Sequence, residues 1–255
     1  MGSSPFRYFI RFQYHGATFH GWQKQPNACT VQETMESALS HLLGKETEVI
    51  GAGRTDTGVH ASEMWAHFDA ENKLDEAQLT YRLNAFLPKS IAIFAIVRVK
   101  EDAHTRFSAV SRTYAYHIHF RKNAFLNDRS WHLRRPLDRE ALDEAAEVMK
   151  EFEEFSAFAR SNDAASHHRC HIFDSMWEHR DDASVYTVKA NRFLRNMVRA
   201  MVGTMIDVGM AKINSENLRS IIRSGDRRRA GESAPPQGLF LTHVEYPEDI
   251  FQWQK

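Results

Sequence analysis

The order of strand-like and helix-like segments constrains the fold of this chain more than any single residue does. In residues 6–14 every even-numbered side chain is aromatic or aliphatic, and this period of two indicates a strand. Residues 30–33 read Thr-Val-Gln-Glu, a capping box, and the apolar spacing after them predicts a helix that ends at Gly44. Two strands (47–50 and 63–69), a helix that opens at Asp75 and a strand at 91–99 complete the first part. The order β-α-β-β-α-β is typical of a ferredoxin-like fold.

The same order of segments recurs after residue 103. Strands are expected at 110–120, 172–179, 185–190 and 239–246, and helices at 142–149, 193–208 and 214–223. We therefore predict an α+β fold of two ferredoxin-like (RRM-like) halves, residues 1–104 and 105–255. We expect the halves to share an extended antiparallel sheet with a central cleft, since clefts of this kind commonly hold ligands.

Composition places the chain among ordinary globular proteins, with 42% hydrophobic and 26% charged residues. The 33 basic residues balance 33 acidic ones, so any binding of nucleic acid would depend on a local basic patch. No apolar run approaches the ~20 residues that cross a bilayer, and no secretory signal is visible. Cys29 and Cys170 lie far apart without C-x-x-C spacing, which favours a reducing compartment. We expect a cytoplasmic protein.

Residues 51–61, Gly-Ala-Gly-Arg-Thr-Asp-Thr-Gly-Val-His-Ala, form a glycine-rich loop between two predicted strands. Its glycines give a permissive backbone that can lie against a ligand. Arg54 and Asp56 bring a cation and a carboxylate close together on it. The simpler interpretation is a strand-connecting turn with an incidental surface ion pair, because short motifs often match by chance. His60 is expected to orient the loop through a hydrogen bond.

Arginines are the second group of interest. Arg192, Arg195 and Arg199 have the i, i+3, i+7 spacing that places side chains on one face of a helix. Either this face is solvated, or at least one arginine points into the cleft and pairs with a carboxylate or a phosphate. Residues 225–238, which include the run 227–229 of three arginines, are expected to form a loop and a candidate mobile flap.

Fourteen histidines raise the question of a metal site. The densest cluster, residues 167–171, has one sulfur and lacks a second ligand pair at zinc-finger spacing. A G-x-S-x-G elbow and a P-loop ending are both missing from the sequence. We expect neither a metal nor a nucleotide cofactor.

Several motifs together carry a family resemblance. Gly53 to Ala61 closely resembles the active-site motif of the TruA family of tRNA pseudouridine synthases, which usually has alanine where this chain has Thr57. Further segments resemble blocks of that family in the same order along the chain, namely 14–16, 21–23, 31–33, 84–88, 104–109, 112–116, 193–199 and 238–241.

This resemblance implies a role for each of four residues. Asp56 would be the catalytic aspartate, Arg199 would pair with it, Tyr114 would stack on the target base, and Arg54 would help to displace or replace the flipped base. The resemblance also implies a homodimer that isomerises uridine to pseudouridine in the anticodon stem-loop of tRNA, at positions 38 to 40, without a cofactor. A basic surface built across two subunits would reconcile RNA binding with zero net charge.

The reaction explains why such residues are needed. The N1–C1′ bond breaks, the uracil turns, and the base rejoins the sugar through C5, with no redox change. The base must first be flipped out of its stack, at a cost of a few kcal/mol. Asp56 then acts as an ionised nucleophile or base, attacking the sugar, attacking the base or removing a sugar proton. A tyrosine near C5 is a further candidate to accept the last proton.

Two other classes of function compete with this interpretation. A non-catalytic RNA-binding module is one, because ferredoxin-like sheets with exposed aromatic residues bind RNA. The presence of Asp56, Tyr114 and Arg199 together argues against it, since binding alone needs no carboxylate facing an RNA backbone. A metal-dependent hydrolase that uses the histidines is the other, and it would lose activity to a chelator.

Overall fold

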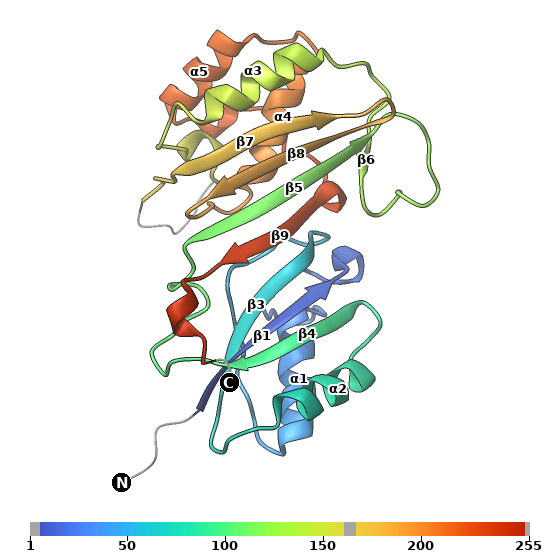
Figure 1. Ribbon diagram of the computed structural model, residues 1–255. Helices are drawn as coiled ribbons and strands as arrows, with labels where there is room; N and C mark the ends of the chain where they lie inside the picture. Colours follow the sequence, from blue (N-terminus) through green and yellow to red (C-terminus); the bar gives the residue numbers. More distant parts are fainter. Residues whose placement is uncertain (1–5, 161–166, 253–255) are drawn as a thin grey trace. The chain divides into compact units, whose positions relative to one another are not determined.

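The computed structural model describes residues 6–160 and 167–252 and confirms an α+β fold (Figure 1). The chain forms two compact units, residues 1–110 with 241–255, and residues 111–240. The C-terminal segment thus returns to the first unit. The division at residues 104 and 105, the ferredoxin-like halves, the shared sheet and the central cleft stay predictions.

The first unit has the predicted element order. Its elements are β1 (Phe6–Tyr14), α1 (Val31–Leu43), β2 (Ile50–Gly51), β3 (His60–Ala70), α2 (Glu76–Phe86) and β4 (Ile91–Arg98). The strands lie in the order β4-β1-β3, β2 pairs with β3, and all these pairings are antiparallel. The last strand, β9 (Leu239–Glu245), neighbours β3.

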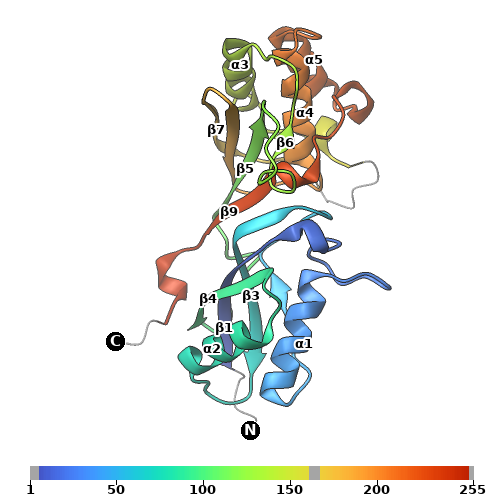
Figure 2. The same cartoon turned by 90° about the vertical axis from the view of Figure 1, so that its right-hand side faces the viewer.

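Local sequence explains the helices of this unit. Thr30 caps α1 by accepting a hydrogen bond from the Glu33 amide at 3.4 Å, and Gly44 ends the helix in the left-handed region at φ 71°. Asp75 caps α2 in the same way. Figure 2 shows α1 running alongside the strands. Its buried side chains and the alternate side chains of β1 form the core of this unit. Burying each large apolar side chain stabilises the folded chain by roughly 1.5–3 kcal/mol.

The second unit contains β5 (Ser111–His119), β6 (Trp131–His132), α3 (Arg139–Met149), β7 (Ile172–His179), β8 (Ala183–Ala190), α4 (Met197–Gly209) and α5 (Ser215–Ser224). Its strands lie in the order β5-β8-β7 with antiparallel pairings, and the short β6 runs parallel to β5. Tyr116 and Tyr186 pair across β5 and β8 and are fully buried. Two residues are too short a strand for periodicity to predict β6.

The predicted basic helical face is wrong. Helix α4 begins at Met197, because Asn196 adopts a left-handed conformation at φ 66° and its side chain donates to Ser233 Oγ at 2.7 Å. Arg192 and Arg195 therefore precede the helix, and only Arg199 lies on it. Arg192 instead donates to the ring of His167 at 3.0 Å. Apolar spacing from residue 193 onward mimics a longer helix, but a backbone that turns at residue 196 cannot continue one.

No helix in residues 6–160 and 167–252 is both long enough and apolar enough to cross a membrane.

Candidate active site

Asp56 lies on a tight turn between β2 and β3. Its carbonyl oxygen accepts a hydrogen bond from the Val59 amide at 3.1 Å, and its side chain is half-buried. Gly58 has φ 78°, a conformation that glycine adopts without strain. The Gly58 amide donates to Phe19 O at 3.4 Å, which ties the end of the turn to the segment after β1. The aspartate thus stands on a short, hydrogen-bonded turn.

Thr55 anchors this turn to the core. Its side chain is buried, and Oγ1 lies 2.8 Å from the hydroxyl oxygen of Tyr14, the last residue of β1. Its carbonyl oxygen accepts from the Trp22 amide at 3.2 Å. Because Thr55 points inward, its neighbours Arg54 and Asp56 are left exposed and half-buried respectively.

The segment that follows β1 packs directly against the backbone of the turn. Gly21 has φ 87°, and a Cβ atom there would lie 2.5 Å from Thr55 O. A Cβ atom at Gly16 would lie 2.0 Å from Val59 O. Both positions therefore require glycine, because any side chain would push two backbone segments apart. The turn is held in place by close contact of backbones.

The structure confirms the expected hydrogen bond by which His60 orients the loop. Its side chain is buried, and Nδ1 accepts a hydrogen bond from the Gly16 amide at 3.0 Å. The ring lies 4.6 Å from that of His15, between centroids. An Nδ1 that accepts this bond leaves the other ring nitrogen as the protonated one in the neutral imidazole.

Arg54 extends away from the core. Its Nε donates to Gln23 Oε1 at 3.0 Å, and its side chain is exposed. Gln23 follows Trp22, whose side chain is buried and packs against Gly51. A Cβ atom at Gly51 would lie 2.5 Å from the indole ring. The orientation of Arg54 therefore depends on the same segment that holds the turn.

The second unit carries the two other predicted residues. Tyr114 lies in β5, half-buried, with its ring 5.1 Å from that of Phe193 in an edge-to-face arrangement of 87°. Tyr116, two residues later, is fully buried and donates its hydroxyl to Pro235 O at 2.7 Å. Burial raises the pKa of Tyr116 well above its ordinary value. Tyr116 therefore stays protonated at neutral pH, and its ring is part of the buried core.

Arg199 is fixed by the segment that precedes β9. It lies in the first turn of α4, and its Nε donates to Ala234 O at 2.7 Å while its carbonyl oxygen accepts from the Ala234 amide at 2.9 Å. A Cβ atom at Gly203 would lie 1.7 Å from Glu232 O, so the segment crosses α4 at very short range. This backbone contact fixes the guanidinium near the start of the helix.

The expected flap of residues 225–238 is anchored within the second unit. Arg227 donates to Gly231 O at 3.0 Å and to Ser233 Oγ at 2.9 Å. Arg228 pairs with Asp226, and Arg229 donates to Ser220 Oγ. All three arginines of the run thus have partners inside the chain. That the segment is a mobile flap stays a prediction.

Arg54 and Asp56 share one loop of the first unit, whereas Tyr114 and Arg199 belong to the second. That the two pairs meet stays a prediction. Sequence reasoning named Tyr14, Gly16, Gly21 and Gln23 only within segments that resemble the family, and it assigned them no contact with the loop. It did not single out Ala234. Tyr14 appears as the last aromatic residue of an alternating strand and as part of the segment 14–16, and neither pattern predicts a contact with residue 55.

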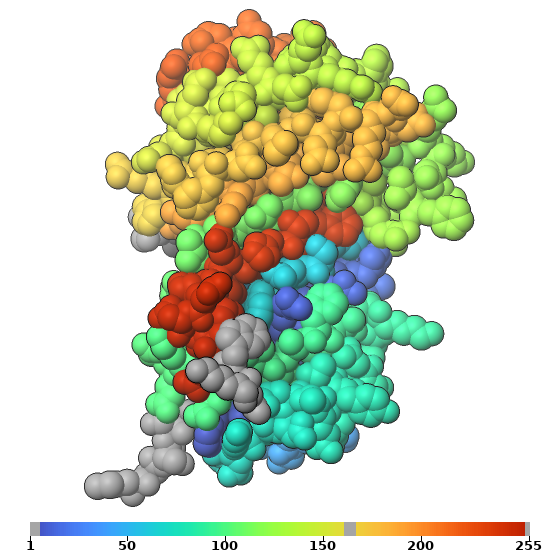
Figure 3. All heavy atoms as spheres, in the orientation of Figure 1, coloured from blue at the N-terminus to red at the C-terminus, as the bar shows by residue number. Residues whose placement is uncertain are grey.

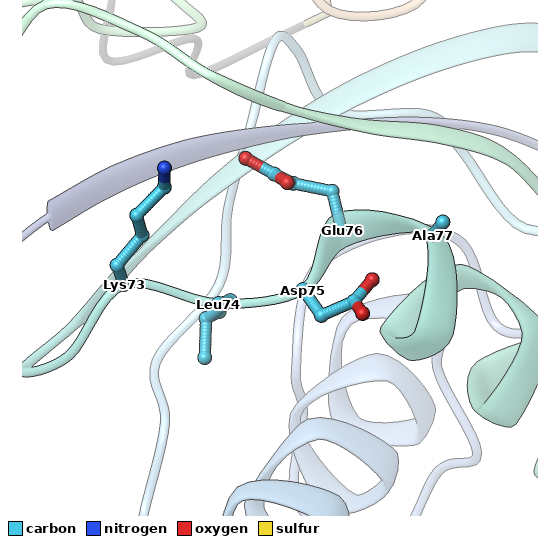
Figure 4. Close-up of a pocket in the computed structure, with 5 residues that line it drawn as sticks. All are labelled: Lys73, Leu74, Asp75, Glu76 and Ala77. Carbon is cyan, nitrogen blue, oxygen red and sulfur yellow. The ribbon is translucent and has the colours of Figure 1, made fainter. Parts of the chain in front are cut away.

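Three further features are candidates for a site: a surface depression, possible metal ligands and a cysteine. An open depression at the start of α2 is lined by residues 73–77, and there Lys73 and Glu76 extend to the same side of the backbone (Figure 4). Among residues 6–160 and 167–252 no group of three or more histidine, cysteine or carboxylate side chains is placed to hold a metal ion. Cys170 is buried, and burial raises its pKa to about 11, which keeps the thiol inert at neutral pH.

Comparison with known proteins decides the family. The model of a family described as tRNA pseudouridine synthase matches residues 10–108 and 153–247, segments from both units. The chain belongs to this family of tRNA pseudouridine synthases. The matched segments include Arg54, Asp56 and Arg199, whereas Tyr114 lies between them.

Relatives within the synthase family resemble the chain over nearly its whole length. A tRNA pseudouridine synthase A of Bacteroides thetaiotaomicron is 46% identical over 96% of this chain and 92% of its own length. The protein of the same name from Bacteroides fragilis is 45% identical over 96% and 98%. That from Thermoanaerobacter pseudethanolicus is 39% identical over 93% and 98%.

Proposed function

We propose that this chain isomerises uridine to pseudouridine in the anticodon stem-loop of tRNA, at positions 38 to 40, with Asp56 as the nucleophile or base after the target base is flipped. The observation that carries the proposal is the half-buried carboxylate of Asp56 on a turn held by Thr55, within a segment that matches the synthase family. A rigid turn suits this reaction, because a catalytic group must be held close to its productive position.

The proposed chemistry conserves all atoms. The N1–C1′ glycosidic bond breaks, the uracil rotates, a C5–C1′ bond forms, and the proton on C5 leaves while N1 gains one. Neither an oxidant nor a metal is needed for this balance. The carboxylate of Asp56 forms a transient bond or removes a proton and is regenerated at the end. The chain therefore needs to supply positioning, one carboxylate and a place for the flipped base.

Three further residues are assigned supporting roles. The exposed guanidinium of Arg54 enters the gap that the flipped uridine leaves, guided by Gln23. The ring of Tyr114 stacks on the uracil, and its edge-to-face contact with Phe193 holds it in one orientation. Arg199 pairs with Asp56 through the attraction between a guanidinium and a carboxylate. The bond from Arg199 Nε to Ala234 O supports this role because it fixes the guanidinium plane.

The acting form is proposed to be a cytoplasmic homodimer. A single chain of 255 residues has zero net charge, so its overall electrostatic attraction for RNA is weak. Two copies would offer twice the local basic surface to one tRNA.

Incubation of the purified chain with unmodified tRNA transcripts tests the proposal. Pseudouridine should form at positions 38 to 40, without added metal or nucleotide and in the presence of a chelator. Folded protein that binds the transcript but makes no pseudouridine would show the non-catalytic RNA-binding module instead. Activity lost to the chelator would favour the metal-dependent alternative. Size-exclusion chromatography with light scattering measures the dimer independently.

A further inference from the structure

The segment between β5 and α3 has an unusual concentration of positive charge. Residues 121–135 contain five basic residues and one acidic residue, a net charge of +4 in a chain whose total is zero. The rest of the chain is accordingly net negative. Figure 1 shows the segment as a long loop that includes the short β6 near its end, and it forms part of the surface in Figure 3. We call residues 121–135 the basic loop.

Backbone hydrogen bonds hold the base of the basic loop at both ends, to the residue before β8 at one end and to β5 at the other. Phe120 donates its amide to Asp182 O at 3.0 Å where the loop leaves β5, and Leu133 donates its amide to His119 O at 2.9 Å where it returns. The pairing of β6 with β5 and the burial of Leu133 hold the returning arm. The charged side chains on either side of this base are therefore presented from a rigid support.

Two of the five cations are engaged within the chain. Arg121 forms an ion pair with Asp182 at 2.8 Å, and Arg129 donates to Phe125 O and lies 3.6 Å from Asp128. The other three, Lys122, Arg134 and Arg135, are exposed. In the described part of the chain none of these three forms an ion pair or a hydrogen bond through its side chain. They can therefore bind an anionic partner without breaking an ion pair or a hydrogen bond within the described part of the chain.

An aromatic side chain stands out from the same loop. Phe125 is 80% exposed, the largest exposed fraction among the large hydrophobic residues described. Turns within the loop fix its backbone, since Asn123 Oδ1 accepts from the Phe125 amide at 2.9 Å. An exposed aromatic ring among unpaired cations matches what single-stranded nucleic acid needs, namely cations for phosphates and a flat face for a base.

We propose that the basic loop is a tRNA-binding element, in which Lys122, Arg134 and Arg135 contact phosphates and Phe125 stacks on an unpaired base. The proposal rests on the proposed function for its choice of RNA, and goes beyond it by assigning residues that hold the substrate outside the reacting uridine. The basic loop lies in the range 109–152, outside the segments that match the family model.

A charge-removal variant tests the loop. Lys122→Gln, Arg134→Gln and Arg135→Gln are combined in the full chain, and affinity for a tRNA transcript is measured over a range of salt concentrations. Each phosphate contact contributes about 0.7–0.9 to the slope of log K against log salt, so the loss of three contacts should make the slope shallower by about two to three. KM for tRNA should rise about tenfold or more, while kcat at saturating tRNA should not change.

The matched control removes three exposed cations of the first unit, by Lys73→Gln, Arg82→Gln and Lys89→Gln, with the same change in net charge. Its affinity should stay within about twofold of the unaltered chain. Phe125→Ala should weaken binding about fivefold or more without changing the salt slope. The proposal is overturned by an unchanged slope in the basic-loop variant, or by an equal loss in the control.

The outcome for the loop is separable from the outcome for the proposed function. A chain that binds tRNA through the basic loop but forms no pseudouridine overturns the proposed function alone. A chain that forms pseudouridine with the same KM and slope in the basic-loop variant overturns this inference alone.

Discussion

The hydroxyl oxygen of Tyr14 lies 2.8 Å from Oγ1 of Thr55, and this contact joins the last residue of β1 to the residue that precedes Asp56. Both side chains are buried. A hydrogen bond of this kind contributes ~0.5–1.5 kcal/mol net to the free energy of unfolding. Leaving a buried hydroxyl without its partner lowers that free energy by more. The position of the proposed catalytic carboxylate thus depends on a tyrosine that lies 41 residues before Thr55 in the chain.

The first prediction concerns this contact. Tyr14→Phe should lower the free energy of unfolding by about 1 kcal/mol and reduce kcat for pseudouridine formation, because the turn loses one of its anchors. Thr55→Val should act similarly. The double variant should lose less free energy of unfolding than the two single variants lose together, since both substitutions remove the same hydrogen bond. Urea denaturation of the four proteins measures the coupling, and strictly additive losses would show that the two residues act separately.

Asp56→Asn carries the second prediction. The amide is nearly the same size but is neutral, so the variant should bind tRNA within about threefold of the unaltered chain and form no pseudouridine. Filter binding and pseudouridine mapping measure the two properties. Asp249→Asn is the control, because this carboxylate is exposed and its 2.6 Å contact is with Lys100 on the surface. Turnover retained by Asp56→Asn would remove Asp56 from the chemistry.

The third prediction compares two glycines near the turn. Gly21→Ala should lower the free energy of unfolding by more than about 2 kcal/mol, since it combines a φ of 87° with a methyl group 2.5 Å from Thr55 O. Gly53→Ala should change it by less than about 0.5 kcal/mol, because nothing lies within 4 Å of the added atom. Thermal and urea denaturation check both. Equal effects at the two sites would contradict the close backbone contact.

The fourth prediction is a pH dependence of stability that arises at His67. Its Nδ1 lies 2.8 Å from Thr105 Oγ1, and burial, with smaller effects of His104 and Arg7, lowers the pKa of His67 from 6.5 to about 4. Between these values the unfolded chain binds a proton that the folded chain does not. The contribution of His67 to stability is therefore complete above pH 6.5 and is lost as the pH falls toward 4.

His67→Gln isolates this effect from that of the carboxylates, which titrate equally in both proteins. The difference in free energy of unfolding between the unaltered chain and the variant should shrink as the pH falls from 7 to 4.5, measured by urea denaturation. A difference that stays constant over this range would show that His67 titrates alike in the folded and unfolded chain.

Sequence alone determined what is local. The capping residues Thr30 and Asp75, the glycine that ends α1 and the alternation of β1 each depend on neighbours a few residues away, so their patterns predicted the elements correctly. The same holds for the motif around Asp56, because the resemblance to the family's active-site motif lies in one short stretch, which the family model also matches.

Tertiary structure decided everything that depends on contacts between distant segments. The left-handed Asn196, held by Ser233, moved the start of α4 and removed Arg192 and Arg195 from it. The partners of Thr55, Arg54 and Arg199 are likewise 30 or more residues away in the chain. Periodicity reports which side of an element is buried but not what it is buried against, so the supports of the proposed site emerged only from the folded chain.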